Sequence, residues 1–201
     1  MSEAEPTPSL IEFWFDFGSP YAWLAAHQIE AVATRAGRGV RWRPFLLGVV
    51  FRETGMAPLA EQKFRGEYGA RDVARCARRL GLGFATAAVP AGVSVACSRA
   101  FYALALAGAD SPRFARVAMD AGFAEGRDIG SAEAARGLAT ALGMDASASE
   151  APEARAALRA ATEEAIRRGI FGSPFVIADG EPFWGQDRLA MLEAWLTEGP
   201  W

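Results

Sequence analysis

Cysteine is scarce in this chain of 201 residues, and the shortage excludes several kinds of chemistry. Cys76 and Cys97 are the only cysteines, and they lie too far apart along the chain to form a Cys-x-x-Cys redox pair or the usual spacing of a zinc site. A disulfide framework is not expected in a domain of this size. We therefore expect two reduced thiols in or near the core, and no metal site.

Clusters of basic residues and long apolar runs are also lacking. The formal net charge is −3 without any basic block, which gives no support to binding of nucleic acid or of a membrane surface. No apolar stretch approaches the ~18 residues that a membrane span needs. The acidic first residues, 1–6, have no hydrophobic core of a secretory signal. A cytoplasmic protein is expected.

Aromatic residues, in contrast, are plentiful. About half of the residues are hydrophobic, and they include 13 Phe and 6 Trp, so the chain can form a sizeable packed core. The length allows one domain of ordinary size, or one domain that carries a substantial insertion.

The first part of the chain predicts a parallel βαβ unit. We expect a disordered leader over 1–9, a strand over 10–15, a helix from Ser19 to about Ala36, and a second strand over 40–47. Two strands joined by a helix in this order pair in parallel with a right-handed crossover.

The centre of the chain is predicted to be entirely helical, and the end returns to strands. Ala-rich segments with helical spacing occupy 59–80, 94–109, 111–124, 131–143 and 152–168, with expected N-caps at Ser111 and Ser131. A hairpin with an Asp179-Gly180 turn then joins 174–178 to 181–184, and a closing helix runs from about Asp187 to Leu196.

This order predicts an α/β protein with the thioredoxin layout, βαβ-ββα, and an all-helical domain inserted at its centre. The thioredoxin-like domain is discontinuous and covers 10–57 and 170–201, while the inserted domain covers 58–169.

The junction after the first strand carries the most informative chemistry. Ser19 and Pro20 are good residues for the start of a helix, where backbone N–H groups favour an anion. In thiol-redox folds the same corner carries Cys-x-x-Cys, but here it reads Ser-Pro-Tyr-Ala. His27 lies about 12 Å further along the predicted helix, too far to serve as a base for Ser19. The corner can be a simple helix cap, or it can stabilise a sulfur anion that another molecule supplies.

Two later motifs are expected to face this corner. In the thioredoxin layout the proline that opens the third strand, here Pro174, is commonly cis, which would leave the Ser173 backbone free to pair with an extended peptide. Gln186 and Asp187 follow the fourth strand, and Asp187 either caps the closing helix or accepts from a ligand ammonium group.

A further polar cluster lies at the start of the helical segment. Tyr68, Asp72 and Arg75 share one helix face through i,i+3 and i,i+4 spacing, and Lys63 and Arg65 precede them. The face is either a solvated ion-paired surface or the source of a cation for a ligand carboxylate.

Taken together, these motifs resemble the 2-hydroxychromene-2-carboxylate isomerase family and its relatives, the kappa-class glutathione transferases. The resemblance rests on five segments in order: 15–25, 41–51, 68–84, 171–175 and 184–189. It implies a DsbA-like thioredoxin fold with a helical insertion, a homodimer, and reduced glutathione as cofactor.

The resemblance also implies roles for single residues. Ser19 would be the catalytic serine that holds the glutathione sulfur as a thiolate, and Ser173, before Pro174, would pair its backbone with the cysteinyl group. Gln186 and Asp187 would hold the γ-glutamyl end. Further contacts to glutathione or substrate are expected from Tyr21 and from Lys63 or Arg65, which compete for one position. Met56 is a further expected contact, at a position where the family usually has an Asn implicated in contact with glutathione or substrate, so the chain departs from the family there. It also departs at Gly92-Val93-Ser94, where an Asn-Ser or Asn-Thr pair is common.

The leading hypothesis is a glutathione-dependent cis–trans isomerase. It would interconvert 2-hydroxychromene-2-carboxylate-type compounds and trans-o-hydroxybenzylidenepyruvate in the catabolism of aromatic hydrocarbons. The alternatives are a glutathione transferase or peroxidase that acts on electrophiles, and a non-catalytic glutathione-binding module. A disulfide oxidoreductase is not expected, because Ser19 and Ala22 occupy the two thiol positions.

Overall fold

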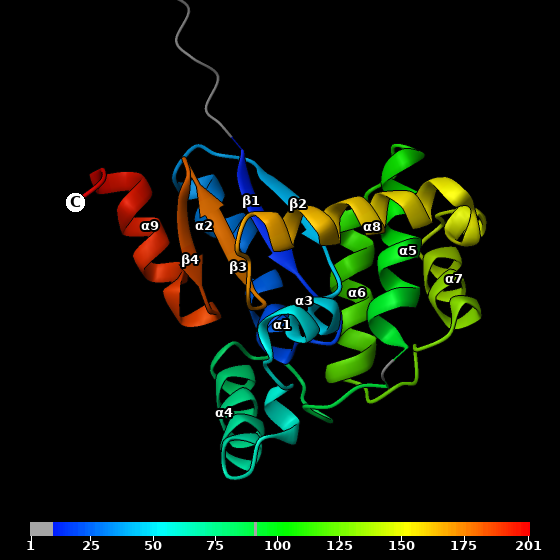
Figure 1. The fold of residues 1–201 in the computed structure, drawn as a ribbon, viewed down its shortest axis with the longest axis horizontal. Coiled ribbons are helices and arrows are strands. Elements are labelled where there is room, and N and C mark those ends of the chain that lie inside the picture. The colour runs from blue at the N-terminus through cyan, green and yellow to red at the C-terminus, as the bar shows by residue number, and fades with distance from the viewer. Residues whose placement is uncertain (1–9, 91) are drawn as a thin grey trace, which may run out of the picture.

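A computed structural model describes residues 10–90 and 92–201, so the predicted leader over 1–9 lies outside the described residues. Figure 1 shows a central sheet with helices on both faces and a group of helices beside it. The elements run in the order β1 (Ile11–Phe15), α1 (Pro20–Ala26), α2 (Ile29–Arg35), β2 (Val40–Pro44), α3 (Leu47–Thr54), η1 (Leu59–Glu61), α4 (Arg65–Arg79), α5 (Val93–Leu106), α6 (Ser111–Phe123), α7 (Ala132–Ala141), η2 (Ser147–Glu150), α8 (Pro152–Arg167), β3 (Phe175–Ala178), β4 (Glu181–Trp184), η3 (Gln186–Arg188) and α9 (Leu189–Glu198).

The sheet has the strand order β2-β1-β3-β4. Strand β1 pairs in parallel with β2 and antiparallel with β3, and β3 pairs antiparallel with β4. The tight turn between β3 and β4 has positive φ at both Asp179 and Gly180, as an Asp-Gly hairpin requires. This is the thioredoxin arrangement, with helices α3 to α8 between β2 and β3, and it confirms the predicted fold class.

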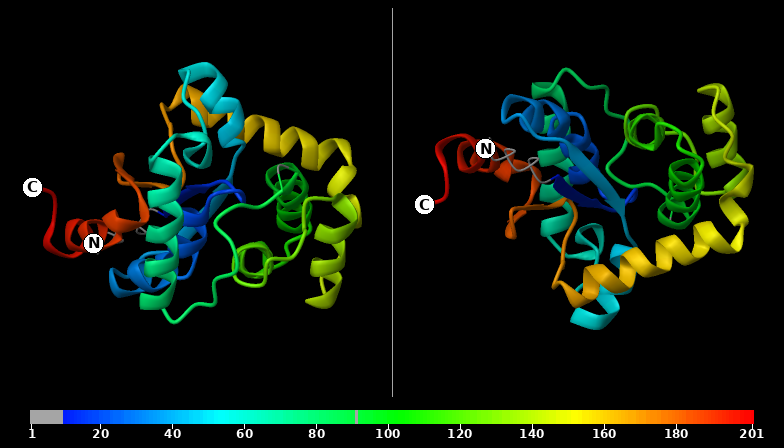
Figure 2. Two further views of the ribbon diagram at one scale, coloured as in Figure 1. Left: turned by 90° about the horizontal axis from the view of Figure 1, so that it is seen from below. Right: turned by 90° about the horizontal axis from the view of Figure 1, so that it is seen from above.

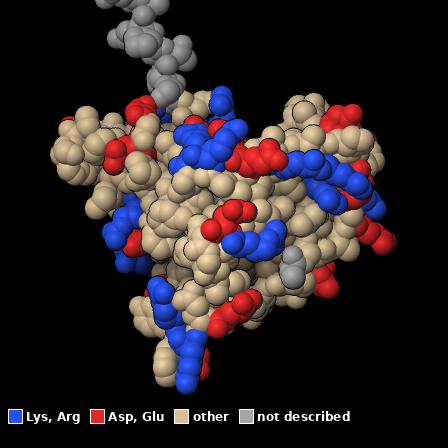
Figure 3. All heavy atoms as spheres, in the orientation of Figure 1, with Lys and Arg blue, Asp and Glu red and all other residues tan. Residues whose placement is uncertain are grey.

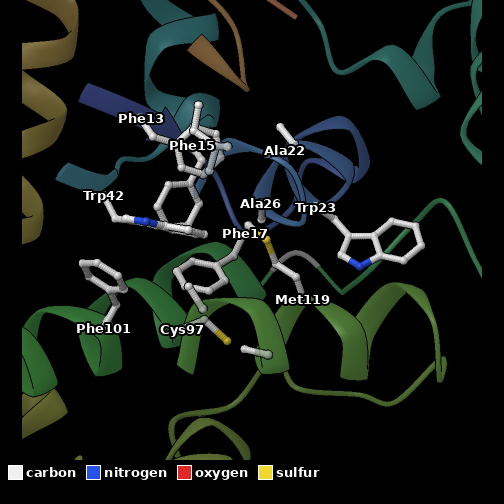
Figure 4. Close-up of a cluster of buried hydrophobic side chains, with 14 of the residues drawn as sticks. Phe13, Phe15, Phe17, Ala22, Trp23, Ala26, Trp42, Cys97, Phe101 and Met119 are labelled. Carbon is white, nitrogen blue, oxygen red and sulfur yellow. The ribbon is translucent and has the colours of Figure 1, made fainter. Parts of the chain in front are cut away.

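Alternate residues of β1 point to opposite faces of the sheet and enter two separate cores. Phe13 and Phe15 lie in the larger core, and Trp14 lies in the smaller one, which α3 and α8 cover. The larger core joins the predicted thioredoxin-like part to the predicted insertion, because Phe15 contacts Phe101 of α5 at a ring separation of 6.0 Å. Figure 4 shows these rings between the sheet and the two helices α5 and α6. The two parts therefore share one core.

Helix α8 returns the chain from the helical part to the sheet. In both views of Figure 2 it extends from beside α7 to the start of β3. The helical segments that the sequence predicts over 58–169 are present, although 59–80 is divided into η1 and α4. The described residues contain no helix long and apolar enough to cross a bilayer.

Two predictions about the first 57 residues are wrong. The predicted strand over 40–47 ends at Pro44, and helix α3 begins at Leu47, because the Asp16 carboxylate accepts the Leu47 N–H at 2.8 Å and starts a helix there. The predicted single helix over 19–36 is two helices. They separate next to Gln28, whose side chain donates to the Leu24 carbonyl at 2.9 Å.

The predicted cap of α6 is also corrected. Asp110, and not Ser111, is the N-cap, and its side chain accepts the Arg113 N–H at 3.0 Å. An aspartate carboxylate is as good a cap as a serine hydroxyl, and Asp110 is one position earlier. The predicted cap of α7 at Ser131 is confirmed.

Candidate active site

Ser19 lies at the corner between β1 and α1 and begins the helix. Its side chain accepts the Ala22 N–H at 3.2 Å, and its own N–H donates to the Asp16 carbonyl at 2.9 Å. Pro20 follows at the first helical position, as the sequence predicts. Ser19 is 8% exposed and counts among the buried polar residues.

The loop before β3 meets this corner directly. The Ser173-Pro174 peptide bond is cis, as expected from the layout. The Ser19 hydroxyl donates to the Ser173 carbonyl at 2.8 Å, and the Ser173 hydroxyl accepts the Asp16 N–H at 2.8 Å. Gly172, next to Ser173, lets the Trp184 indole pack against the loop, because a Cβ there would lie 2.1 Å from Nε1 of Trp184. The corner and the loop are thus held together by two hydrogen bonds, both donated by the corner and both accepted by Ser173.

The segment after β4 is attached to the same loop. The Gly185 N–H donates to the Pro174 carbonyl at 3.1 Å, and η3 contacts α1. Within η3, the Gln186 amide points toward Cys76 of α4, with Nε2 3.6 Å from Sγ. Asp187 is exposed and is not the cap of the closing helix, since Arg188 occupies the N-cap of α9. The cap interpretation of Asp187 is therefore wrong.

Asp16 is a buried residue of this site that the sequence reasoning missed. Its carboxylate accepts from the Gly18 N–H at 2.7 Å, the Leu47 N–H at 2.8 Å and the Ser94 hydroxyl. Burial raises the pKa of Asp16, and these three hydrogen bonds oppose the rise. Asp16 joins the corner to α3 and to α5. An acidic residue directly after a buried strand is the signal that would have pointed to it.

His27 takes no part in the corner. Its Nε2 lies 2.8 Å from Oδ1 of Asp120 on α6, and Trp23 Nε1 donates to the same oxygen at 2.7 Å. This agrees with the sequence argument that His27 cannot act as a base for Ser19.

Helix α4 forms a second wall beside the corner. The Tyr21 hydroxyl donates to Asp72 at 3.0 Å, and Arg75 donates to the other oxygen of the same carboxylate. The Arg75 guanidinium also lies 5.9 Å from the centre of the Tyr68 ring, as expected for residues on one helix face. Burial and the Asp72 carboxylate raise the pKa of Tyr21, so its hydroxyl stays protonated.

A cavity of about 480 Å³ opens between Tyr21 and this wall. Its lining consists of Tyr21, Leu59, Phe64, Arg65, Tyr68 and Gly69. Arg65 therefore lines the cavity, whereas the Lys63 ammonium lies 5.1 Å from the centre of the Phe64 ring. Met56 is 41% exposed on the loop after α3 and is not among the lining residues. Leu59 and Phe64 are lining residues that the sequence reasoning did not single out.

The two cysteines differ in their surroundings. Cys97 is buried, and burial raises its pKa to about 12, so it is unreactive in the folded protein. Cys76 is partly exposed, and its pKa is also raised, chiefly by burial and then by Asp72. Both thiols are free, as the sequence predicts, and neither contributes a nucleophile at the Ser19 corner.

Comparisons with known proteins agree with this architecture. Residues 10–197 match the family described as a DSBA-like thioredoxin domain. A 2-hydroxychromene-2-carboxylate isomerase of Sphingobium xenophagum is 29% identical over 94% of this chain and 98% of that protein. One of Pseudomonas putida is 28% identical over 92% and 93%. A solved 2-hydroxychromene-2-carboxylate isomerase structure superposes with a TM-score of 0.79 at 27% identity and covers 94% of this chain and 95% of that one.

Proposed function

The chain belongs to the DSBA-like thioredoxin domain family, and within it we propose a glutathione-dependent cis–trans isomerase of hydroxychromene carboxylates and their ring-opened benzylidenepyruvates. The observation that carries the proposal is the hydrogen bond of 2.8 Å from the Ser19 hydroxyl to the carbonyl that precedes the cis-proline. It joins the two elements that a bound thiol peptide would touch at once. Ser19 and Ala22 stand where disulfide chemistry would need cysteines.

The residues at the corner suit a glutathione molecule. The Ser173 carbonyl can accept the cysteinyl N–H by the same strand-like pairing that β-addition uses, and the cis bond at Pro174 presents that carbonyl to the corner. Asp187 is exposed in η3, which contacts α1, and its carboxylate, 3.6 Å from the exposed Arg188 guanidinium, suits an α-ammonium group. Gln186 adds an amide next to it.

Glutathione, when bound, supplies a thiol whose anion adds reversibly to a conjugated double bond, so that the bond can rotate before the sulfur leaves. The chain's part is to hold that sulfur as an anion. The Ser19 O–H turns from the Ser173 carbonyl toward the sulfur, while the Ser173 carbonyl receives the ligand N–H in exchange. The Ala22 N–H continues to donate to Ser19 Oγ, which keeps the hydroxyl in place and makes it a better donor.

The test is a spectrophotometric assay of 2-hydroxychromene-2-carboxylate with and without reduced glutathione. We expect turnover only with glutathione. Ser19→Ala is expected to lower kcat by about 100-fold or more, because it removes a donor to the developing sulfur anion, with a smaller change in glutathione affinity.

Ser131→Ala is the matched control, because Ser131 caps α7 in the same way and has no hydrogen bond to Ser19 or Ser173 among those of the described residues. It should reproduce a cap loss of about 1 kcal/mol with normal kcat. Equal turnover of Ser19→Ala and the natural chain would reject the proposal. Stable glutathione adducts of an electrophile without hydroxychromene turnover would indicate a transferase, and stabilisation by glutathione without any turnover would indicate a binding module.

We place this activity in the cytoplasm, where glutathione keeps thiols such as Cys76 and Cys97 reduced. The homodimer that the resemblance implies stays a prediction, which sedimentation equilibrium can test.

A further inference from the structure

Phe64 has an unusual backbone conformation for a residue with a side chain. Its φ is +67° and its ψ is −45°, and the Arg65 N–H donates to the Lys63 carbonyl at 2.8 Å across it. This is a γ-turn of the strained form, with positive φ at the centre. The Phe64 side chain is also 75% exposed, so burial of the ring does not compensate for the strain within this chain. Strain of this kind is often retained at sites of function.

Packing of η1 on α4 holds the turn in this conformation. A Cβ at Gly66 would lie 2.8 Å from the Ala60 carbonyl oxygen, and one at Gly69 would lie 2.8 Å from Cδ2 of Leu59. The Gly66 N–H also donates to the Gln62 carbonyl at 2.8 Å. Segment η1 therefore lies against the start of α4 although only a few residues separate them, and the sharp turn at Phe64 makes this possible.

The turn places an aromatic ring and a cation side by side at the cavity. Phe64, Tyr68 and Tyr21 supply aromatic surface to the lining, and Arg65 is the cation among the lining residues. Arg65 donates to the neutral Gln62 side chain at 2.9 Å, which leaves its charge available to an anion. Arg75, by contrast, donates to Asp72.

We propose that Phe64 is the specificity-determining residue of an aromatic-carboxylate site in this cavity, with Arg65 as the carboxylate anchor. The Phe64 ring covers one face of a flat, conjugated ring system, and Arg65 binds the carboxylate in a bidentate fashion. Tyr21, two residues after Ser19, places the site next to the corner. The inference rests on the proposed function, and it describes how the aromatic carboxylate that the glutathione sulfur attacks would be bound. It also assigns the carboxylate to Arg65 and not to Lys63.

Direct binding of three probes tests the proposal without any turnover. The probes are trans-cinnamate, cinnamyl alcohol, which lacks the carboxylate, and crotonate, which lacks the ring; each is titrated calorimetrically into the full chain with glutathione present. We expect cinnamate to bind most tightly. Phe64→Gly should weaken cinnamate about tenfold and leave crotonate unchanged, whereas Arg65→Gln should weaken cinnamate about tenfold and leave cinnamyl alcohol unchanged.

Phe64→Gly separates a loss of binding from a loss of stability. Glycine adopts the positive φ without strain, so the thermal stability of the variant should be equal or higher. If Phe64→Gly does not fold, Phe64→Ala tests the same point, since it removes the ring and, having a Cβ like Phe, adds no backbone strain. Unchanged cinnamate affinity in either variant would overturn the proposal, and so would an equal loss for all three probes.

Failure of the proposed function is distinguishable from failure of this inference. Cinnamate binding that depends on Phe64 and Arg65 in a chain without hydroxychromene turnover would keep the site and reject the isomerase. If hydroxychromene turnover is normal and Phe64→Gly leaves the KM unchanged, the isomerase is kept and the proposed role of Phe64 is rejected.

Discussion

The two walls of the candidate site differ in burial and in the kind of contact that holds them. At the corner, Asp16 is 4% exposed and Ser19 is 8% exposed, and their polar atoms are hydrogen-bonded within the protein. On the α4 wall, Phe64 is 75% exposed and Tyr68 is 63% exposed. Under the proposed function, this difference divides the work: the buried wall would fix the position of the reacting sulfur, and the exposed wall would select the compound that the sulfur attacks.

The walls share apolar packing, since Val73 and Ala77 of α4 lie in the same core as Ala22 of α1, and they also make polar contacts. Tyr21 donates to Asp72, and Gln186 lies near Cys76. The surface around α4, at the bottom of Figure 3, carries charged side chains of both signs next to uncharged ones. The exposed side chains of this wall, such as Phe64 and Tyr68, can change without disturbing the core, whereas the buried residues at the corner cannot.

The largest expected effect on stability comes from removing the Asp16 carboxylate from the buried wall. Asp16→Ala leaves the Gly18 and Leu47 N–H groups and the Ser94 hydroxyl without their acceptor, and we expect a loss of about 3–5 kcal/mol in the free energy of unfolding. Urea unfolding measures it. Asp110→Ala is the matched control, because Asp110 is an exposed cap and should cost about 1 kcal/mol. Equal losses in the two variants would show that Asp16 has no special role.

The next largest effect on stability is expected from a substitution at Gly66, which would separate η1 from α4 on the exposed wall. In Gly66→Ala the new Cβ would lie 2.8 Å from a backbone oxygen of η1, so we expect a loss of about 1–3 kcal/mol and weaker cinnamate binding, with glutathione affinity unchanged. Gly137→Ala in α7 is the control. Nothing lies within 4 Å of its Cβ position, and it should gain about 0.5–1 kcal/mol from helix propensity. A gain in both variants would contradict the tight packing of η1.

A smaller effect is expected from separating the two walls at Tyr21. Tyr21→Phe removes the hydrogen bond to Asp72 and keeps the ring, which should cost about 0.5–1.5 kcal/mol. A double-mutant cycle with Asp72→Ala isolates the pair in thermal unfolding. A coupling energy of zero would mean that the walls are joined elsewhere.

The smallest expected effect is a pH dependence of the free energy of unfolding that arises from Asp16 on the buried wall. Because burial raises the pKa of Asp16 above 3.8, the folded protein holds a proton that the unfolded chain has already released. The free energy of unfolding should therefore fall, relative to Asp16→Asn, as the pH rises from about 4 toward neutrality. Hydrogen bonds to the carboxylate oppose the shift and keep the slope small. Urea series at several pH values measure it, and a difference that rises with pH would contradict it.

The sequence predicts the parts of this site whose signals are local. Ser19 begins its helix and Asp179-Gly180 forms the turn, because cap and turn chemistry act over a few residues. The cis bond before Pro174 follows from the predicted thioredoxin layout and not from a local signal. The strand order follows from the sequence of elements in the chain.

What the sequence does not predict depends on distant partners. Helix α3 begins where Asp16 receives the Leu47 N–H and Thr162 of α8 receives the Leu46 N–H, and neither partner is near in sequence. The turn at Phe64 exists because η1 packs on Gly66. Local propensity favours a strand at the first place and a continuous helix at the second, and tertiary contacts override it at both.

The pairing of β1 has a consequence for the order in which the molecule can assemble. Phe13 pairs with Trp42 on one side and with Val176 on the other, so the central strand completes its hydrogen bonds only after α8 has been made. During synthesis, the edge of β1 that later pairs with β3 stays unpaired, although α5 and α6, which cover its aromatic face, have already been made. Such long-range pairing slows folding and leaves that edge open to other chains until the last strands arrive.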